Sequence, residues 1–230
     1  MITVDEVRTR LGVVREQIAR AAERVRRDPR DVTVVAVTKG WPAEAVRTAI
    51  EAGITDIGEN RVQEAAGKAS VLVPGTRFHL VGHLQSNKAA KAAAMFDVIH
   101  SVASAELAAA IDAAARGSGR CIEVLVQVNV ARDPAKSGLF EPAVGEVLAR
   151  LEPLRSIRVV GLMTIGPLAQ SPDDSRPVFR TLRELRDRLA PGFPGLRHLS
   201  MGMSSDYAVS VEEGATMVRI GTALFGPRTS

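Results

Sequence analysis

Short continuous apolar runs alternate with amphipathic stretches along almost the whole chain, and this alternation restricts the fold more than any other feature. The clearest runs are VTVVAV and IEVLVQVNV, which contain few of the alternating polar residues of a half-exposed strand. Such strands are covered on both faces, which is typical of parallel sheets. We therefore expect eight parallel strands, at residues 32–38, 54–58, 77–81, 97–101, 121–130, 157–162, 196–200 and 216–220.

Helical patterns fill the intervals between these strands. The expected helices are residues 42–52, 60–70, 86–95, 104–116, 139–151, 174–190 and 205–213. A further helix precedes the first strand, because apolar residues recur every three or four positions from Val4 to Val25. Thr3 and Glu6 have the spacing of a capping box at its start.

Eight strands with helices between them predict an α/β fold, a closed (β/α)8 TIM barrel with an extra N-terminal helix. An open doubly wound sheet is the alternative, but it usually carries a glycine-rich phosphate loop after its first strand. The segment TKGWP stands at that position here and is no such loop. A length of 230 residues is ordinary for one barrel, so we expect one domain spanning residues 1–230.

Composition and charge argue against several classes of partner. The net charge is only +4 and the arginines are scattered, so we expect no nucleic-acid partner. No apolar run approaches the roughly 18 residues of a membrane span, and the N-terminus lacks the order of a signal peptide. The single cysteine, Cys121, excludes a disulfide within the chain. We expect a cytoplasmic protein, and a monomer because no additional interface element is visible.

Polar residues and glycines gather where the strands end, which is where barrels carry their functional sites. The stretches GMSS and GTA follow the seventh and eighth strands. Their small residues allow backbone N–H groups to approach an anion, and Ser204 and Thr222 add hydroxyls. A short helix beginning near Thr222 would point its positive end at that anion. Together the two stretches predict a phosphate site.

Lys39 ends the first strand, which lies beside the eighth in a closed barrel. We therefore expect Lys39 to be partly buried next to the phosphate site. Burial lowers the pKa of a lysine, because loss of water disfavours the ammonium form, and so frees its amine. A free amine forms a Schiff base with a carbonyl compound. The pattern therefore predicts a phosphorylated carbonyl ligand held as an imine.

Arg219 precedes the GTA stretch by two residues. If its side chain points inward, it can face a bound ring and leave a pyridine nitrogen unprotonated, because arginine only donates hydrogen bonds. Pairing with a neighbouring carboxylate is the alternative. Met201, with Met163 and Met203, is a candidate for lining the ring pocket. No pattern of His, Cys and carboxylate ligands accompanies the strand-end histidines, so we predict no metal site.

Taken together, the motifs of this chain resemble those of the YggS/PROSC family of pyridoxal phosphate (PLP) homeostasis proteins. The resemblance covers residues 32 to 226, in order and in spacing. It rests on VAVTKGWP, GENRVQEA, FHLVGHLQSNKA, IHSV, VQVNVARDPAKSGL, GLMTIGP, LSMGMSSDY and VRIGTALFG. The family is similar to the barrel domain of alanine racemase, a fold-type III PLP protein.

The resemblance implies roles for individual residues. Lys39 would carry PLP as an aldimine, Asn60 would lie near the cofactor, and Arg219 would face the pyridine nitrogen. The residues implied to hold the phosphate are Ser204, Gly221 and Thr222. Members are generally regarded as PLP carriers or regulators of its supply, so PLP-dependent apo-enzymes are the implied protein partners.

Two classes of function stay open. The first is a PLP-binding protein of intracellular PLP homeostasis without robust catalysis. The second is an enzyme, either a minimal amino-acid racemase or a Schiff-base lyase that uses Lys39. A racemase needs a second acid–base group opposite the lysine. Tyr207 is the one tyrosine, and the chain ends soon after the eighth strand. We therefore expect no added β-domain of the kind that supplies a tyrosine in alanine racemases.

Overall fold

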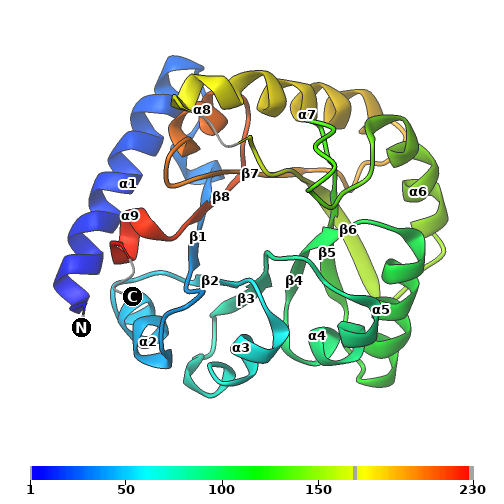
Figure 1. The fold of residues 1–230 in the computed structure, drawn as a ribbon, viewed down its shortest axis with the longest axis horizontal. Coiled ribbons are helices and arrows are strands. Elements are labelled where there is room, and N and C mark those ends of the chain that lie inside the picture. Colours follow the sequence, from blue (N-terminus) through cyan, green and yellow to red (C-terminus); the bar gives the residue numbers. More distant parts are fainter. Residues whose placement is uncertain (1, 168–169, 228–230) are drawn as a thin grey trace.

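The eight strands of the protein form one closed ring. The computed structural model describes residues 2–167 and 170–227. Neighbouring strands pair in parallel in sequence order, and the eighth pairs with the first, while the helices surround the ring (Figure 1). The predicted TIM barrel is confirmed, and the open sheet is wrong. Residues 1, 168–169 and 228–230 of the predicted 1–230 domain lie outside the described residues.

All eight expected strands are present, with ends displaced by a few residues. They are β1 (Thr33–Val37), β2 (Asp56–Glu59), β3 (Arg77–Leu80), β4 (Val98–Val102), β5 (Ile122–Gln127), β6 (Ile157–Met163), β7 (His198–Met203) and β8 (Met217–Ile220). Strand β5 is shorter than predicted because the chain beyond Gln127 pairs with a returning loop. The N–H of Asn129 donates to Leu139 O, and the N–H of Leu139 donates to Gln127 O.

The helices lie where they were predicted but are mostly shorter. They are α1 (Val4–Arg24), α2 (Ala43–Glu51), α3 (Val62–Ala66), α4 (Ala89–Met95), α5 (Ala105–Gly117), α6 (Val144–Leu151), α7 (Arg176–Leu189), α8 (Tyr207–Glu212) and α9 (Thr222–Phe225). The expected helix 60–70 is divided into α3 and a 3₁₀ turn, Ala69–Val71. Between them Lys68 turns its side chain into the protein, where it is buried.

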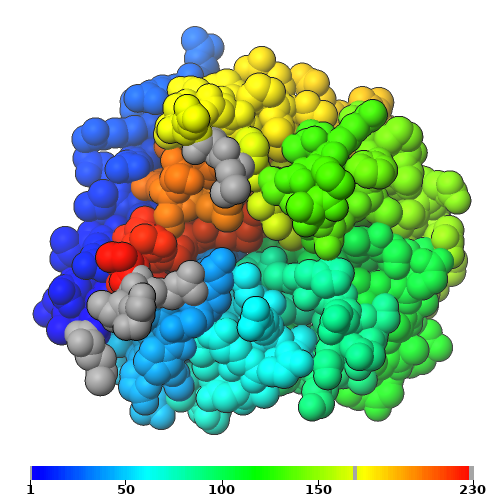
Figure 2. All heavy atoms as spheres, viewed as in Figure 1, coloured from blue at the N-terminus to red at the C-terminus, as the bar shows by residue number. Residues whose placement is uncertain are grey.

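Helix α1 packs against α8, α9 and α2, and so completes the ring of helices around the barrel. Thr3 and Glu6 form the predicted capping box, and the stripe that includes Leu11 and Ile18 is buried. In Figure 2 the N-terminal segment packs directly against the C-terminal segments. Arg10 contributes to this contact by donating to Leu224 O at 3.2 Å. The predicted extra helix is therefore present, and it covers the barrel beside α8 and α9.

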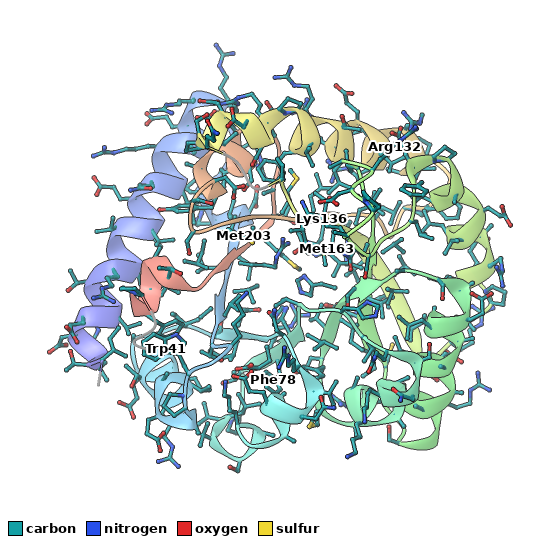
Figure 3. All side chains as sticks on the ribbon, viewed as in Figure 1. Trp41, Phe78, Arg132, Lys136, Met163 and Met203 are labelled. Atoms are coloured by element: carbon teal, nitrogen blue, oxygen red, sulfur yellow. The ribbon has the colours of Figure 1, made fainter. Side chains whose placement is uncertain are left out.

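The core has an apolar outer layer and a partly polar centre. Aliphatic side chains fill the layer between the strands and the helices. Inside the ring of strands, Met163 packs with a few aliphatic residues, and its label in Figure 3 lies within the ring. The interior also contains buried polar side chains: Asp56, His79, His100, Ser200 and Arg219. None of the helices in the described ranges is long and apolar enough to cross a membrane.

Candidate functional site

A cavity of about 590 Å³ lies at the carboxyl ends of the strands. Its lining residues are Val37, Lys39, Asn60, Val81, Ile165, Met203, Ser204, Ser205, Arg219, Gly221 and Thr222. Strands β1 and β8 pair directly, with Val35 opposite Arg219. This pairing brings Lys39 next to Gly221 and Thr222, as the closed barrel predicts.

Lys39 lies at the rim of this cavity. Its side chain is exposed, so the predicted partial burial is wrong. The reason is local: β1 ends at Val37, and Lys39 lies on the turn beyond it rather than between strands. The place of Lys39 at the cavity therefore depends on the residues that hold its turn.

A buried lysine, Lys68, forms hydrogen bonds to that turn from the interior of the protein. The ammonium group of Lys68 donates to Thr38 O at 2.7 Å, to Glu59 Oε1 at 2.6 Å and to Glu64 Oε1 at 2.8 Å. Burial raises the pKa of Glu59, although hydrogen bonds from Lys68 and Thr38 act in the opposite direction. Among the described residues, nothing hydrogen-bonds the buried Glu59 Oε2. The cluster of Lys68, Glu59 and Glu64 therefore depends on the ammonium group of Lys68 to balance the negative charge of its carboxylates.

The same carboxylates hold both neighbours of Lys39. The hydroxyl of Thr38 donates to Glu59 Oε1, and the N–H of Gly40 donates to Glu64 Oε1. Gly40 has φ +73°, a left-handed conformation that glycine adopts without strain. Residues on both sides of Lys39 are thus fixed, which limits where its amine can reach.

The opposite side of the cavity presents backbone donors. Within the described chain, the N–H groups of Ser204, Ser205 and Thr222 donate to no protein group. The hydroxyl oxygen of Ser204 accepts from the N–H groups of Gly221 at 3.3 Å and Ala223 at 3.1 Å, which ties the two loops together. Three free N–H groups on adjoining loops form a concave site for an anion.

Met203, not Met201, lines the cavity. Met201 is fully buried in the layer between the barrel and its helices. The register of β7 against β8 shifts between Ser200 and Met203, and Gly202 at φ +90° redirects the chain there. Met203 therefore reaches the interior, where Figure 3 labels it. The prediction for Met201 is wrong because a strand alternation extrapolated from sequence does not include this irregularity.

Arg219 points inward and is only 5% exposed. Its guanidinium donates to Ser200 Oγ at 2.7 Å and to Thr164 O at 2.9 Å. Burial lowers the pKa of Arg219 to about 10, and the charge of Asp206 opposes this shift. In the described ranges no carboxylate forms an ion pair with Arg219, so the alternative of a paired arginine is not seen. Its remaining N–H groups are donors for whatever occupies the cavity.

Asn60 follows β2 and completes the rim. Its backbone lies so close to Gly82 that any side chain at position 82 would collide with it. This close approach holds Asn60 against the cavity. Tyr207, by contrast, is not among the lining residues: its hydroxyl donates to Gln17 Oε1 at 2.6 Å, and burial raises its pKa.

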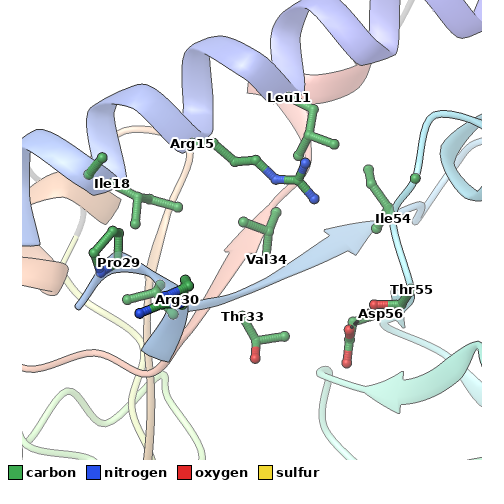
Figure 4. Close-up of a pocket in the computed structure, with 13 residues that line it drawn as sticks. Leu11, Arg15, Ile18, Pro29, Arg30, Thr33, Val34, Ile54, Thr55 and Asp56 are labelled. Atoms are coloured by element: carbon green, nitrogen blue, oxygen red, sulfur yellow. Dashed lines mark hydrogen bonds between the residues drawn. The ribbon is translucent and has the colours of Figure 1, made fainter.

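A second cavity, of about 500 Å³, lies at the other end of β1, under α1. Figure 4 shows Arg15 and Arg30 at this cavity, together with Thr33 and Asp56. Both arginines are exposed. Because the amino-terminal face of a barrel serves mainly stability, the first cavity is the candidate functional site.

Known proteins share this fold and much of this sequence. The alanine racemase N-terminal domain model matches residues 9–229. A pyridoxal phosphate homeostasis protein of Aquifex aeolicus is 40% identical over 221 residues, which are 95% of this chain and 97% of that protein. The chain belongs to the family of pyridoxal phosphate homeostasis proteins.

Solved structures of related proteins agree with this membership. The family member PipY of Synechococcus elongatus, solved with PLP bound, has a TM-score of 0.84 and 38% identity, covering 96% of this chain and all of PipY. An alanine racemase of Clostridium difficile has a TM-score of 0.78 at 16% identity, covering all of this chain and 58% of the racemase. At this low identity, the similarity to the alanine racemase shows a shared fold alone.

The cavity fits the chemistry of PLP. An amine stands at the rim, free backbone N–H groups lie at the anion end, and a donor-only guanidinium lies on the inner wall. Val37, Val81 and Ile165 supply apolar surface for a flat ring. Sequence reasoning missed the supporting residues Lys68, Glu59 and Glu64. The acidic pair in GENRVQE, five residues apart, was the available signal, but nothing in it shows that both carboxylates meet one buried lysine.

Proposed function

We propose that this protein binds PLP in the carboxyl-end cavity, with Lys39 as its covalent attachment point, and acts in PLP homeostasis without robust catalysis. The observation that carries the proposal is the convergence of the Lys39 amine, the free N–H groups of the phosphate loops and Arg219 on one cavity. The PLP-bound structure of PipY supports it. When bound, the cofactor supplies an aldehyde carbon that an amine can attack.

Five of the lining residues have a defined task in this proposal. Ser204 and Thr222 hold the phosphate, Gly221 joins their loops through its N–H to Ser204 Oγ, and Asn60 contacts the cofactor at the rim. Arg219 donates to the ring nitrogen, which keeps that nitrogen unprotonated because a guanidinium does not give up its proton under ordinary conditions. An unprotonated ring is a weak electron sink, which suits storage better than turnover.

The phosphate loops provide the first test. Replacing Ser204 and Thr222 together with alanine should weaken PLP binding about 10–100-fold, the scale of losing hydrogen bonds to a charged group. Binding of pyridoxal, which has no phosphate, should change little. Titration by absorbance measures both ligands. Thr48→Ala with Ser118→Ala removes one threonine and one serine hydroxyl from the outer helices and serves as the matched control. Equal weakening of both ligands would contradict the phosphate assignment.

The absence of robust catalysis provides the second test. In the described chain, the cavity lining offers Lys39 but no second side chain suited to proton transfer on the opposite face, and Tyr207 is engaged by Gln17. General acid–base help is worth about 10²–10⁴-fold, so Cα exchange of alanine or serine should proceed only at trace rates. NMR in deuterated water measures this exchange. Rapid, stereochemically scrambled exchange that Lys39→Ala abolishes would make the protein a racemase.

The proposal extends to the protein partners, the oligomeric state and the cellular location. The exposed Lys39 and the exposed rim residues Ser205 and Thr222 leave the cavity open to solvent, which suits delivery of PLP to apo-enzymes. We also propose one PLP-binding domain over residues 1–230, a monomer, and a cytoplasmic location, with which the exposed thiol of Cys121 is compatible.

A further inference from the structure

A continuous chain of hydrogen bonds crosses the interior of the barrel. Arg219 Nη1 lies 2.7 Å from Ser200 Oγ, which lies 2.8 Å from His100 Nδ1. His100 Nε2 lies 2.9 Å from His79 Nδ1, and His79 Nε2 lies 3.0 Å from Asp56 Oδ1. Strands β8, β7, β4, β3 and β2 each contribute one of these residues. No sequence motif joins them, since only the closed barrel brings them together.

This chain joins the two faces of the barrel. Arg219 lines the cavity at the carboxyl ends of the strands. Asp56 lines the cavity at the amino ends, where Figure 4 labels it. The side chains between them are completely buried, and Asp56 is 8% exposed. Solvent therefore plays little part in the interior hydrogen bonding, and each polar atom depends on its protein neighbours.

The proton positions follow from the chemistry of the groups. Arg219 can only donate, so Ser200 Oγ accepts from it. Among the described residues, the one acceptor within reach of the Ser200 hydroxyl hydrogen is His100 Nδ1. His100 must then carry its hydrogen on Nε2 and donate to His79 Nδ1. His79 in turn donates from Nε2 to the carboxylate of Asp56.

The charges at the ends agree with this direction. Burial would raise the pKa of Asp56, but hydrogen bonds from His79 and Thr55 outweigh it and lower that pKa, so the carboxylate is ionised. Burial, with the nearby His79 and Arg219, holds the pKa of His100 well below its usual value. His100 is therefore neutral. Every bond points from the cation to the anion, and aligned hydrogen bonds strengthen one another in a low-dielectric interior.

We propose that Asp56, His79, His100 and Ser200 are positioning residues that hold Arg219 in place through a directed hydrogen-bond relay from the opposite face of the barrel. The proposal rests on the proposed function, in which Arg219 faces the ring nitrogen of PLP. A buried cation is costly unless it is paired and hydrogen-bonded. Within the described ranges Arg219 forms no ion pair, and the charge of Asp206 acts on it without direct contact, so its hydrogen bonds must hold it in place. The relay connects it to Asp56 without placing a carboxylate in the cavity, where an anion would repel the ligand's phosphate.

The proton arrangement can be measured without any ligand. In ¹⁵N NMR of the full chain without added PLP, His79 and His100 should both show a hydrogen on Nε2 only. His100 should stay neutral at neutral pH, because burial holds its pKa well below its usual value. His198, whose Nδ1 lies 3.2 Å from Thr216 Oγ1, provides a reference outside the relay. A hydrogen on Nδ1 of either His100 or His79 would overturn the relay.

The link to Arg219 is tested by two variants. Ser200→Ala removes the first acceptor, and Asp56→Asn removes the charge at the far end of the relay while keeping an oxygen for His79. Each should shift the ¹⁵N signals of the Arg219 guanidinium, weaken PLP binding about tenfold and move the absorbance maximum of bound PLP. Asp31→Asn, which removes an exposed carboxylate beside the start of β1, is the control and should change none of these.

The outcomes separate this inference from the proposed function. Failure of the unmodified protein to bind PLP would overturn the proposed function and, with it, the role of Arg219 toward the ring, while the tautomers would still report on the relay. PLP binding with unchanged Arg219 signals in both relay variants would overturn the positioning role and leave the proposed function standing. If Asp56→Asn does not fold, the tautomers of the unmodified protein and the Ser200→Ala variant decide.

Discussion

Replacing Lys39 with alanine should abolish the covalent attachment of PLP and leave the barrel folded. The covalent link needs an amine at the cavity rim, and Lys39 is the lysine among the lining residues. Because its side chain is exposed, the substitution should change the free energy of unfolding by no more than about 0.5 kcal/mol. The absorbance band of the linked cofactor at about 420 nm should disappear, while the thermal unfolding transition should persist.

Lys91→Ala is the control for this experiment. Lys91 is an exposed lysine on α4 and does not line the cavity. The control should bind PLP as the unmodified protein does. A band that survives in Lys39→Ala would contradict the assignment of Lys39, whatever the result for Lys91→Ala.

Lys68→Met should destabilise the protein by about 3–5 kcal/mol, because it leaves the buried carboxylate of Glu59 without its cation. The loss is large because both side chains are almost completely removed from solvent. Urea unfolding measures it. PLP attachment should also become slower and weaker, since Thr38 and Glu64 lose the ammonium group that organises the turn around Lys39.

A double variant and a surface pair give the controls. Adding Glu59→Gln to Lys68→Met removes the uncompensated charge and should recover most of the lost stability. Arg20→Met breaks the exposed pair with Glu16, and such pairs contribute only about 0–1 kcal/mol. Equal losses in Arg20→Met and Lys68→Met would show that burial of the Lys68 cluster has no special importance.

The eight strands could be predicted because a strand that is covered on both faces is a continuous apolar run, and such a run can be recognised in each strand separately. VTVVAV at β1 shows this without knowledge of its neighbours. Once the ring is closed, the ends of β1, β7 and β8 must meet, so Lys39, Ser204 and Thr222 could be placed in one site from sequence. The outcome for Met201 shows the limit: beside the shift of register in β7 near Gly202, Met201 lies outside the cavity, while Met203, also a candidate, lines it.

The burial of individual side chains could not be predicted in the same way. Lys39 and Lys68 are both lysines near apolar segments, yet one is exposed and the other buried. The difference arises because Lys68 meets Glu59 and Glu64 from separate elements. His79 and His100 likewise belong to different strands, and the register in which β3 pairs with β4 brings their rings within hydrogen-bond distance.

The most direct test of the central claim is to find which lysine of the unmodified protein carries PLP. Borohydride reduction makes the link permanent, and mass spectrometry of the digested protein then locates the added mass. We expect it on the peptide that contains Lys39, with the band at about 420 nm lost on reduction. Added mass on Lys68, Lys88 or Lys136 instead of Lys39 would contradict the account.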